Sequence, residues 1–423
     1  MAFPGFMNIA ALTLCIFVLA NCNHQVQASS RAFSGKESKI SPGNGLCASW
    51  VTIHGYKCQE LEVTTKDGYI LSIQRIPEGR SEVKNNVTKK KEPVIVQHGV
   101  AVDGATWFLN SPKQNLPMIL ADNGFDVWVT NTRGTKYSRK HTSLDPSNKK
   151  YWDWSWDELV TDEMPAIFDF VSKQTGEQKI NYIGHSLGTL VALVSLSEGK
   201  WVNQVKSVAL LSPIAYLSKV KTVLGQVGAR SLLGEGLTLL GVGEFGLNQV
   251  HVLEFFKGVC SQPEVTCDNK LLLSKKNILT EIAGENCCLT SSAFQQFLKV
   301  APQSSSTRNL FHLAQTVRSG VLAKFDFERL GSNMVHYGKL TPPIYNLSNI
   351  PKNVPIFISY GGRDALSDVA DVKRLLNEHF RNHDTGKLSV QFIDNYAHLD
   401  YVMAANANEI VYKNVTSFFQ RQW

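Results

Sequence analysis

The amino-acid sequence predicts an α/β fold: a mostly parallel sheet with helices on both faces, interrupted by one inserted helical block. Strand and helix patterns alternate from about residue 60 to residue 212. Repeated β-α-β units require right-handed crossovers, which place helices over both faces of a parallel sheet. The alternation stops after Pro213 and resumes near Val354, so the segment between them is expected to be an insertion. With 423 residues, of which 43% are hydrophobic, the chain is long enough to bury a large core.

The first part of the expected sheet consists of short apolar runs that end at turn residues. Residues 69–76 alternate between apolar and polar, as in a half-buried strand, whereas 92–99 and 125–134 are continuous apolar runs, typical of buried parallel strands. Residues 115–124 and 156–176 are expected to be helices, and both end at a glycine. The pattern continues with a strand at 179–185, a helix at 187–197 and a strand at 205–213.

Residues 214–350 are expected to form a helical cap, because helix-like segments and glycine-rich connections replace the alternation there. Within the cap, Leu232–Leu247 mixes leucines with glycines and carries Glu235 and Glu244, so it is not expected to span a membrane. This stretch fits a mobile lid, and a static helical cap is the alternative. The sheet is expected to resume with a strand at 354–362, a helix at 369–380, a strand at 387–395 and a terminal helix from about Asn408.

The first 28 residues are expected to be a secretory signal peptide. Ile9–Ala20 is an apolar stretch too short to span a bilayer comfortably, and Val26-Gln27-Ala28 offers a small-residue cleavage site. No lysine or arginine precedes the apolar stretch, so a retained anchor is the alternative. Cleavage would leave a core in two parts, 29–213 and 351–423, on either side of the cap. The expected destination is secretion or a vacuole-like or lysosome-like compartment.

The cysteines fit an oxidising compartment. Of the eight cysteines, Cys15 and Cys22 lie in the expected signal peptide. The six others are Cys47, Cys58, Cys260, Cys267, Cys287 and Cys288. Sequence proximity suggests the pairs Cys47–Cys58 and Cys260–Cys267, with other pairings and free thiols as alternatives. Cys287 and Cys288 are adjacent and are not expected to bond to each other.

Charge and surface motifs narrow the class of partner. The chain has 43 Lys+Arg against 36 Asp+Glu, a net charge of +7. The basic residues are scattered, with the densest cluster at Lys89–Glu92, so nucleic acid is not an expected partner. Three Asn-x-Ser/Thr sequons, at Asn86, Asn346 and Asn414, are expected glycosylation sites in a secreted chain. No cofactor, metal or required protein partner is expected.

The pentapeptide Gly184-His185-Ser186-Leu187-Gly188 follows a predicted buried strand and opens a predicted helix. A G-x-S-x-G sequence in this setting indicates a nucleophile elbow, in which a tight turn exposes the serine hydroxyl at the edge of the sheet. The helix N-terminus then directs free N–H groups at developing negative charge. Ser186 is therefore the candidate nucleophile, and an ordinary glycine turn is the alternative.

A serine hydroxyl needs a base, and on this kind of sheet the acid and then the base follow the serine along the chain. Asp364 lies just beyond the predicted strand at 354–362, and His398 lies just beyond the strand at 387–395. The carboxyl ends of parallel strands are where such sites lie. Asp364 is expected to orient the imidazole, and His398 to serve as base and then as acid. The competing candidates are Asp368 and Asp394 for the acid and His383 for the base.

Two backbone N–H groups are needed to stabilise an oxyanion. One should belong to the residue after the nucleophile, Leu187, and the other to a loop after an early strand. Val100 follows His98-Gly99 at the end of such a strand and is the expected second donor. His98 and His185 are expected to be structural rather than to carry protons.

Taken together, these motifs resemble those of the acid lipase family, which includes gastric lipase, lysosomal acid lipase and plant triacylglycerol lipases, and they are closest to the plant members. The matching stretches are "GYKCQELEVTTKDGYILSIQRIP", "HGV…W", "ILADNGFDVWVTNTRGTKYSRKH", "YWDWSWDELVTDEMPAIFDFV", "YIGHSLGT", "YGGRDALSD" and "NYAHLDYV". The resemblance covers about residue 50 to the C-terminus and is weakest from about 214 to 345.

The resemblance implies an α/β-hydrolase with a cap and lid that cleaves carboxylic esters of long-chain lipids, as a triacylglycerol lipase does. The family's nucleophile, acid and base fall on Ser186, Asp364 and His398, and its oxyanion donors fall on Val100 and Leu187. Animal members have glutamine at the position of Leu187, a change that a backbone donor tolerates.

The implied partner is a lipid ester at an oil–water or membrane surface. Sterol ester hydrolase, thioesterase and small-molecule esterase are alternatives, because acyl transfer uses the same parts for all of them. A non-catalytic lipid-binding protein is less favoured, because candidates for all three triad positions are present. The animal members' disulfide in the inserted region is implied to correspond to Cys260–Cys267.

Overall fold

The computed structural model describes residues 45–85, 91–220, 242–246, 280, 282–328 and 331–422, all within the compact unit Gly45–Trp423. Four sequence-based predictions lie outside these residues. They are the signal peptide at 1–28, the glycosylation site at Asn86, the pair Cys260–Cys267 and most of the Leu232–Leu247 stretch. Within the described ranges, no helix is both long enough and apolar enough to cross a membrane.

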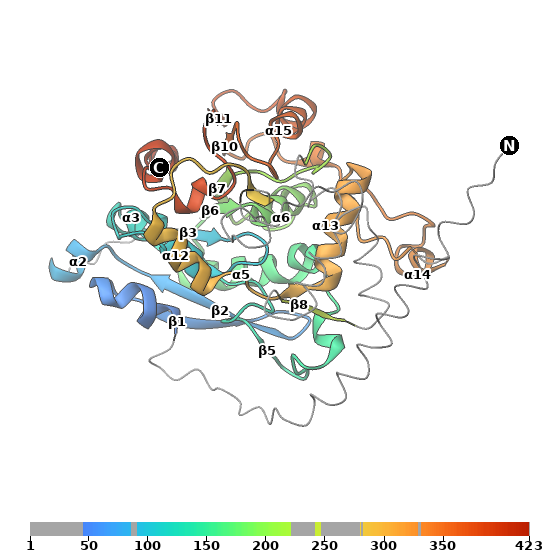
Figure 1. The fold of residues 1–423 in the computed structure, drawn as a ribbon, viewed down its shortest axis with the longest axis horizontal. Coiled ribbons are helices and arrows are strands. Elements are labelled where there is room, and N and C mark those ends of the chain that lie inside the picture. The colour runs from blue at the N-terminus through green and yellow to red at the C-terminus, as the bar shows by residue number, and fades with distance from the viewer. Residues whose placement is uncertain are drawn as a thin grey trace, which may run out of the picture. The chain divides into compact units, whose positions relative to one another are not determined.

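A central sheet of mostly parallel strands carries the fold (Figure 1). Its strands lie in the order β1 (Gln59–Thr64), β2 (Tyr69–Ile76), β4 (Phe125–Thr130), β3 (Glu92–Gln97), β6 (Ile180–His185), β7 (Val205–Leu211), β10 (Ile356–Gly361) and β11 (Leu388–Ile393). β2 is antiparallel to β1 and β4, and every neighbouring pair from β4 to β11 is parallel. The predicted parallel sheet is confirmed. β1 and the two-residue β5 (Lys140–His141), which pairs with β2, extend it beyond the expected strands.

Helices cover both faces of the sheet because side chains of each buried strand alternate between the two faces. Ile95 and Trp128 belong to one apolar cluster, whereas Val94 and Val127 belong to the other. The first cluster includes α5 (Met164–Gln174), α6 (Leu187–Ser197) and α15 (Val369–Leu375), and the second includes α3 (Leu116–Asp122) and α17 (Lys413–Gln420). The two cores make the sheet the middle layer of three, as the alternating sequence pattern predicts.

The predicted helix at 156–176 is present but changes its winding near its start. It consists of α4 (Trp156–Glu158), a π-helical turn η5 (Leu159–Glu163) and α5. Ser155 begins it with a capping box, in which its hydroxyl and the Glu158 carboxylate satisfy the first N–H groups. Pro165 lacks an N–H and cannot close the usual i→i−4 bond, which accounts for the wider turn before it.

The remaining elements are short and connect these layers. They are η1 (Cys47–Val51), η2 (Thr52–His54), α2 (Arg80–Asn85), η3 (Gly104–Phe108), η4 (Lys149–Trp152), η6 (Leu347–Asn349), η7 (Leu376–Phe380), α16 (Asp400–Met403) and η8 (Asn408–Tyr412). The described residues between 214 and 350, where a cap is expected, include α12 (Ser291–Val300), α13 (Thr307–Ser319) and α14 (Ser332–Tyr337), with a two-stranded pair of β8 (Glu244–Phe245) and β9 (Ser305–Ser306).

Two disulfides lie within the described residues. The pair Cys47–Cys58 is confirmed, with Cα atoms 5.5 Å apart. The expectation that Cys287 and Cys288 do not bond to each other is wrong, since they form a disulfide across neighbouring residues. The backbone turns at this point so that both cysteine N–H groups donate to one carboxylate, that of Asp400. The disulfide between the two neighbouring cysteines closes a small ring at this turn, and their spacing in the sequence does not reveal the turn.

Candidate active site

Ser186 lies at the sharp turn between β6 and α6, as the elbow motif predicts. Its backbone has φ 54° and ψ −119°, a strained combination for a residue with a side chain. The turn is tight because Gly184 and Gly188 have no side chains: a Cβ on Gly184 would lie 2.7 Å from the Gly188 backbone. The Ser186 N–H donates to Leu211 O at 3.2 Å, which ties the turn to the end of β7.

Asp364 and His398 come together at the same edge of the sheet, directly after β10 and β11. His398 Nδ1 lies 3.0 Å from Asp364 Oδ2 and 3.1 Å from Oδ1, so its N–H donates to the carboxylate. Both side chains are buried. Two of the competing candidates have other partners: Asp368 caps α15 through the Ala370 N–H, and His383 Nε2 contacts Val354 O. The third, Asp394, is exposed.

The Asp364 carboxylate is held in its ionised form by several donors. Ser212 Oγ donates to Oδ2 at 2.6 Å, and the N–H groups of Leu366 and Ser367 donate to Oδ1 at 2.9 and 2.7 Å. Burial alone would raise the pKa of Asp364. The neighbouring His398 and the hydrogen bonds outweigh burial and hold that pKa below its usual value. An ionised Asp364 fixes the tautomer of His398, with the proton on Nδ1.

The other ring nitrogen of His398 is left without a partner. Nε2 is buried and accepts no hydrogen bond from any described residue. The ring lies against the elbow, since the centroids of the His398 and His185 rings are 4.9 Å apart. Burial lowers the pKa of His185 to about 3, so this ring is neutral, and its Nε2–H donates to His398 O at 2.9 Å. His185 thus holds the His398 backbone beside the elbow, while Nε2 of His398 remains able to take a proton.

The loop after β3 lies against Ser186. A Cβ on Gly99 would lie 2.9 Å from Ser186 Cβ and 3.3 Å from its Oγ, so only a bare backbone fits there. His98 Nδ1–H donates to Gly99 O at 2.7 Å, and His98 Nε2 accepts from Thr132 N at 3.0 Å. Gly99 O and the Val100 N–H belong to one planar peptide and point in opposite directions. His98 therefore sets the direction of the Val100 N–H, while Leu187, the other expected donor, begins α6.

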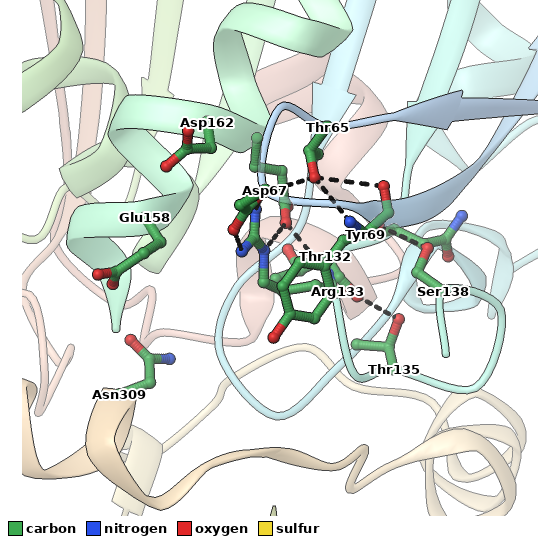
Figure 2. Close-up of polar contacts among 12 residues, drawn as sticks. Thr65, Asp67, Tyr69, Thr132, Arg133, Thr135, Ser138, Glu158, Asp162 and Asn309 are labelled. Carbon is green, nitrogen blue, oxygen red and sulfur yellow. Dashed lines mark hydrogen bonds and ion pairs between the residues drawn. The ribbon is translucent and has the colours of Figure 1, made fainter. Parts of the chain in front are cut away.

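Burial also keeps His98 neutral. It lowers the pKa of His98 to about 4, so the ring donates from one nitrogen and accepts at the other. The Thr132 N–H, from which His98 Nε2 accepts a hydrogen bond, belongs to the residue before Arg133, a fully buried arginine. Arg133 Nε donates to Glu163 at 3.1 Å, its guanidinium pairs with Asp67, and it lies 4.0 Å from the Tyr69 ring centroid. Figure 2 shows Arg133 beside Asp67 and Tyr69. This ion-paired cluster anchors the loop on which His98 rests.

Three contributors to the site were not predicted from the sequence: Ser212, Arg133 and Asp400. Ser212 directly follows β7 and has φ 52°, and only the fold brings it to Asp364, 152 residues later. Asp400 follows His398 by two residues, and its position in the sequence gives no hint of its contacts with Cys287 and Cys288. The acidic partners of Arg133 come from a strand turn and a helix that are far apart in sequence.

Among the described residues, one group of side chains has donor atoms close enough to suggest a metal: Cys287, Cys288 and Asp400, within 4.8 Å of one another. The two sulfurs are bonded to each other, so neither is available as a thiolate ligand. The group therefore does not fit a metal centre in this state.

A parallel sheet layered by helices, with a serine elbow and an Asp–His pair at its carboxyl edge, defines an α/β-hydrolase. A family model described as "alpha/beta hydrolase fold" matches residues 92–233, and one described as "Partial alpha/beta-hydrolase lipase region" matches residues 47–111. A solved structure of a putative lipase from Sulfolobus solfataricus shares this fold, with a TM-score of 0.52 at 15% identity over 86% of this chain and 94% of that chain.

Two similar proteins identify the family of α/β-hydrolases to which the chain belongs. Triacylglycerol lipase 2 of Arabidopsis thaliana is 45% identical over 416 residues, which cover 98% of this chain and 97% of that protein. Gastric triacylglycerol lipase of Rattus norvegicus is 33% identical over 396 residues, or 90% of this chain and 94% of that protein. The chain belongs to the acid lipase family.

Proposed function

We propose that this chain is a triacylglycerol lipase that works through an acyl-enzyme on Ser186. The observation that carries the proposal is the pairing of Asp364 with His398 beside the Ser186 elbow, with Nε2 of His398 free to accept a proton. The substrate class is supported by the names of the relatives, which are triacylglycerol lipases from a plant and from an animal.

In the proposed reaction, His398 Nε2 takes the proton of Ser186 Oγ as the oxygen attacks the ester carbonyl. The carbonyl oxygen becomes an oxyanion that accepts from the N–H groups of Val100 and Leu187, each worth about 2.7–4 kcal/mol of barrier. His398 then gives its proton to the departing alcohol, and Asp364 stabilises the imidazolium in between. Water, activated in the same way, hydrolyses the acyl-enzyme and restores the serine.

The substrate is proposed to be met at an oil–water or membrane surface. In the cap, α14 and the loop after it expose Met334, Val335, Leu340 and Ile344 at 45, 84, 72 and 68% of their surface. Residues 332–346 themselves contain no aspartate or glutamate. Large exposed apolar side chains next to one another are typical of surfaces that bind another apolar phase.

The proposed route is entry into the secretory pathway after removal of residues 1–28. The Cys47–Cys58 disulfide supports an oxidising compartment, and Asn346 and Asn414 are exposed, as glycosylation requires. The proposed organisation is a core of residues 29–213 and 351–423 that carries the triad, with a cap at 214–350.

The test is turnover of an emulsified long-chain triacylglycerol by the purified chain, with Ser186→Ala as the control. Fatty acid release by the wild type and none by the variant is the expected result. A parallel series with a sterol ester and soluble short-chain esters identifies the preferred leaving group. Hydrolysis of the short esters alone would contradict a lipase and favour a general carboxylesterase.

A further inference from the structure

The cap contributes a segment, Ala283–Leu289, that runs along the loops of both the acid and the base. Gly284 forms an antiparallel bridge with Asp364, and Leu289 forms one with Ala404. The approach is close: Gly284 has φ 89°, and a Cβ there would lie 2.1 Å from Arg363 O. This segment of the cap is therefore built into the wall of the site.

The loop that carries His398 has no regular secondary structure, and its backbone is bonded to this cap segment. The His398 N–H donates to Ala283 O at 3.1 Å, and the Leu399 N–H donates to the Asn286 side chain at 3.0 Å. Further on, the Ala405 N–H donates to Cys288 O at 2.9 Å. The position of the imidazole therefore depends on these contacts between chain segments more than 100 residues apart.

Asp400 is the centre of this contact. Its carboxylate is fully buried and accepts three backbone N–H groups: Ala397 at 2.8 Å, Cys287 at 3.1 Å and Cys288 at 3.2 Å. These donors replace part of the hydration that the carboxylate loses, although burial still raises the pKa of Asp400 above its usual value. Asp400 thus ties the residue before His398 to the disulfide turn of the cap.

We propose that Asp400 is a positioning residue for His398, and that the Cys287–Cys288 disulfide turn is the anchor to which it holds the histidine loop. The inference rests on the proposed function, because His398 acts as the base in it. A misplacement of the base by about 1 Å can cost about 10²-fold in rate. Loss of the carboxylate should therefore be seen in kcat, while KM for a small soluble ester changes little.

The test compares Asp400→Asn with Asp126→Asn. Asp126 is also a buried carboxylate and is paired with Arg75. It lies near the amino end of β4, whereas the candidate site lies at the carboxyl ends of the strands. In Asp400→Asn an amide group replaces one acceptor oxygen, so at least one of the three N–H groups loses its partner. With p-nitrophenyl butyrate we expect kcat to fall about 10- to 100-fold at a KM within about twofold of wild type. Asp126→Asn should keep kcat even where its melting temperature falls.

A second variant tests the anchor and remains informative if Asp400→Asn does not fold. The double change Cys287→Ser with Cys288→Ser keeps both N–H groups and removes the covalent tie. A fall in kcat of about threefold or more at unchanged KM supports the anchor. Wild-type kcat in Asp400→Asn, or in the serine pair, would overturn the inference while leaving the proposed function intact. Absence of turnover in the wild type itself would instead sink the proposed function.

Discussion

His98 orients the peptide that carries the N–H of Val100, the proposed oxyanion donor, and this leads to a prediction that two matched substitutions can test. His98 uses one ring nitrogen for each of two contacts, Nδ1–H to Gly99 O at 2.7 Å and Nε2 to the Thr132 N–H at 3.0 Å. An asparagine at this position places its amide where Nδ1 lies, and a glutamine places its amide near Nε2. His98→Asn therefore keeps the hold on Gly99, whereas His98→Gln keeps the contact with Thr132.

The expected magnitudes differ between stability and catalysis. Each variant leaves one buried backbone group unpaired, at a cost of about 1–3 kcal/mol, so both should lose comparable stability. Only His98→Gln releases the peptide that carries the Val100 N–H. Loss of one oxyanion donor lowers kcat about 10²- to 10³-fold. We expect that range for His98→Gln and a decrease of less than about tenfold for His98→Asn.

The assay is steady-state hydrolysis of a soluble p-nitrophenyl ester, with thermal unfolding of each variant measured alongside. KM should change little, because the donor acts on the oxyanion and not on the bound ester. His383→Gln is the control: its Nε2 contacts Val354 O before β10, away from the site. Equal kcat values for His98→Gln and His98→Asn would refute the assignment of the Gly99 contact to catalysis.

Three further predictions follow from buried polar groups and from the exposed surface. Ser212→Ala removes a 2.6 Å bond that lowers the pKa of Asp364, so the acid limb of the kcat/KM profile should move to higher pH; an unmoved limb would contradict this role. Burial raises the pKa of Asp103 from 3.8 to about 7, so the folded state binds the proton more tightly and stability falls as pH rises between these values. One oxygen of Asp103 has no partner among the described residues, so Asp103→Asn should raise the melting temperature at pH 8 by more than at pH 4; equal melting shifts would argue against a raised pKa. Replacing Val335 and Leu340 together by aspartate should lower turnover of emulsified triacylglycerol at least tenfold and leave a soluble ester unaffected, because the apolar area of each is worth about 1.5–3 kcal/mol in lipid; equal losses on both substrates would point to misfolding instead.

Much of the core could be predicted because its signals are local. Buried parallel strands are continuous apolar runs, and Ser186 stands between a strand and a helix with glycines that permit the close turn. The proximity of Asp364 and His398 could be predicted because parallel strands end at one edge of the sheet. β1 was missed because "QELEVT" is mostly exposed and polar, with no apolar pattern to mark it.

The unpredicted parts depend on contacts between distant segments. Ser212 meets Asp364 across 152 positions, and the Cys287–Cys288 turn meets Asp400 across more than 100. The adjacent cysteines were expected not to pair because neighbouring residues cannot easily bond to each other. The turn that lets them pair is held by a carboxylate from another part of the chain. Such contacts come from tertiary packing, which the hydrophobic periodicity and the spacing of motif residues do not reveal.

The most direct measurement is the site of phosphonylation by a fluorophosphonate, read by mass spectrometry of the intact chain and its peptides. One adduct on Ser186 in the wild type, none in Ser186→Ala, and labelling slowed about 10³-fold or more in His398→Ala are the results that the proposed triad predicts. A folded wild type that takes no adduct, or takes it at another residue, would contradict the account.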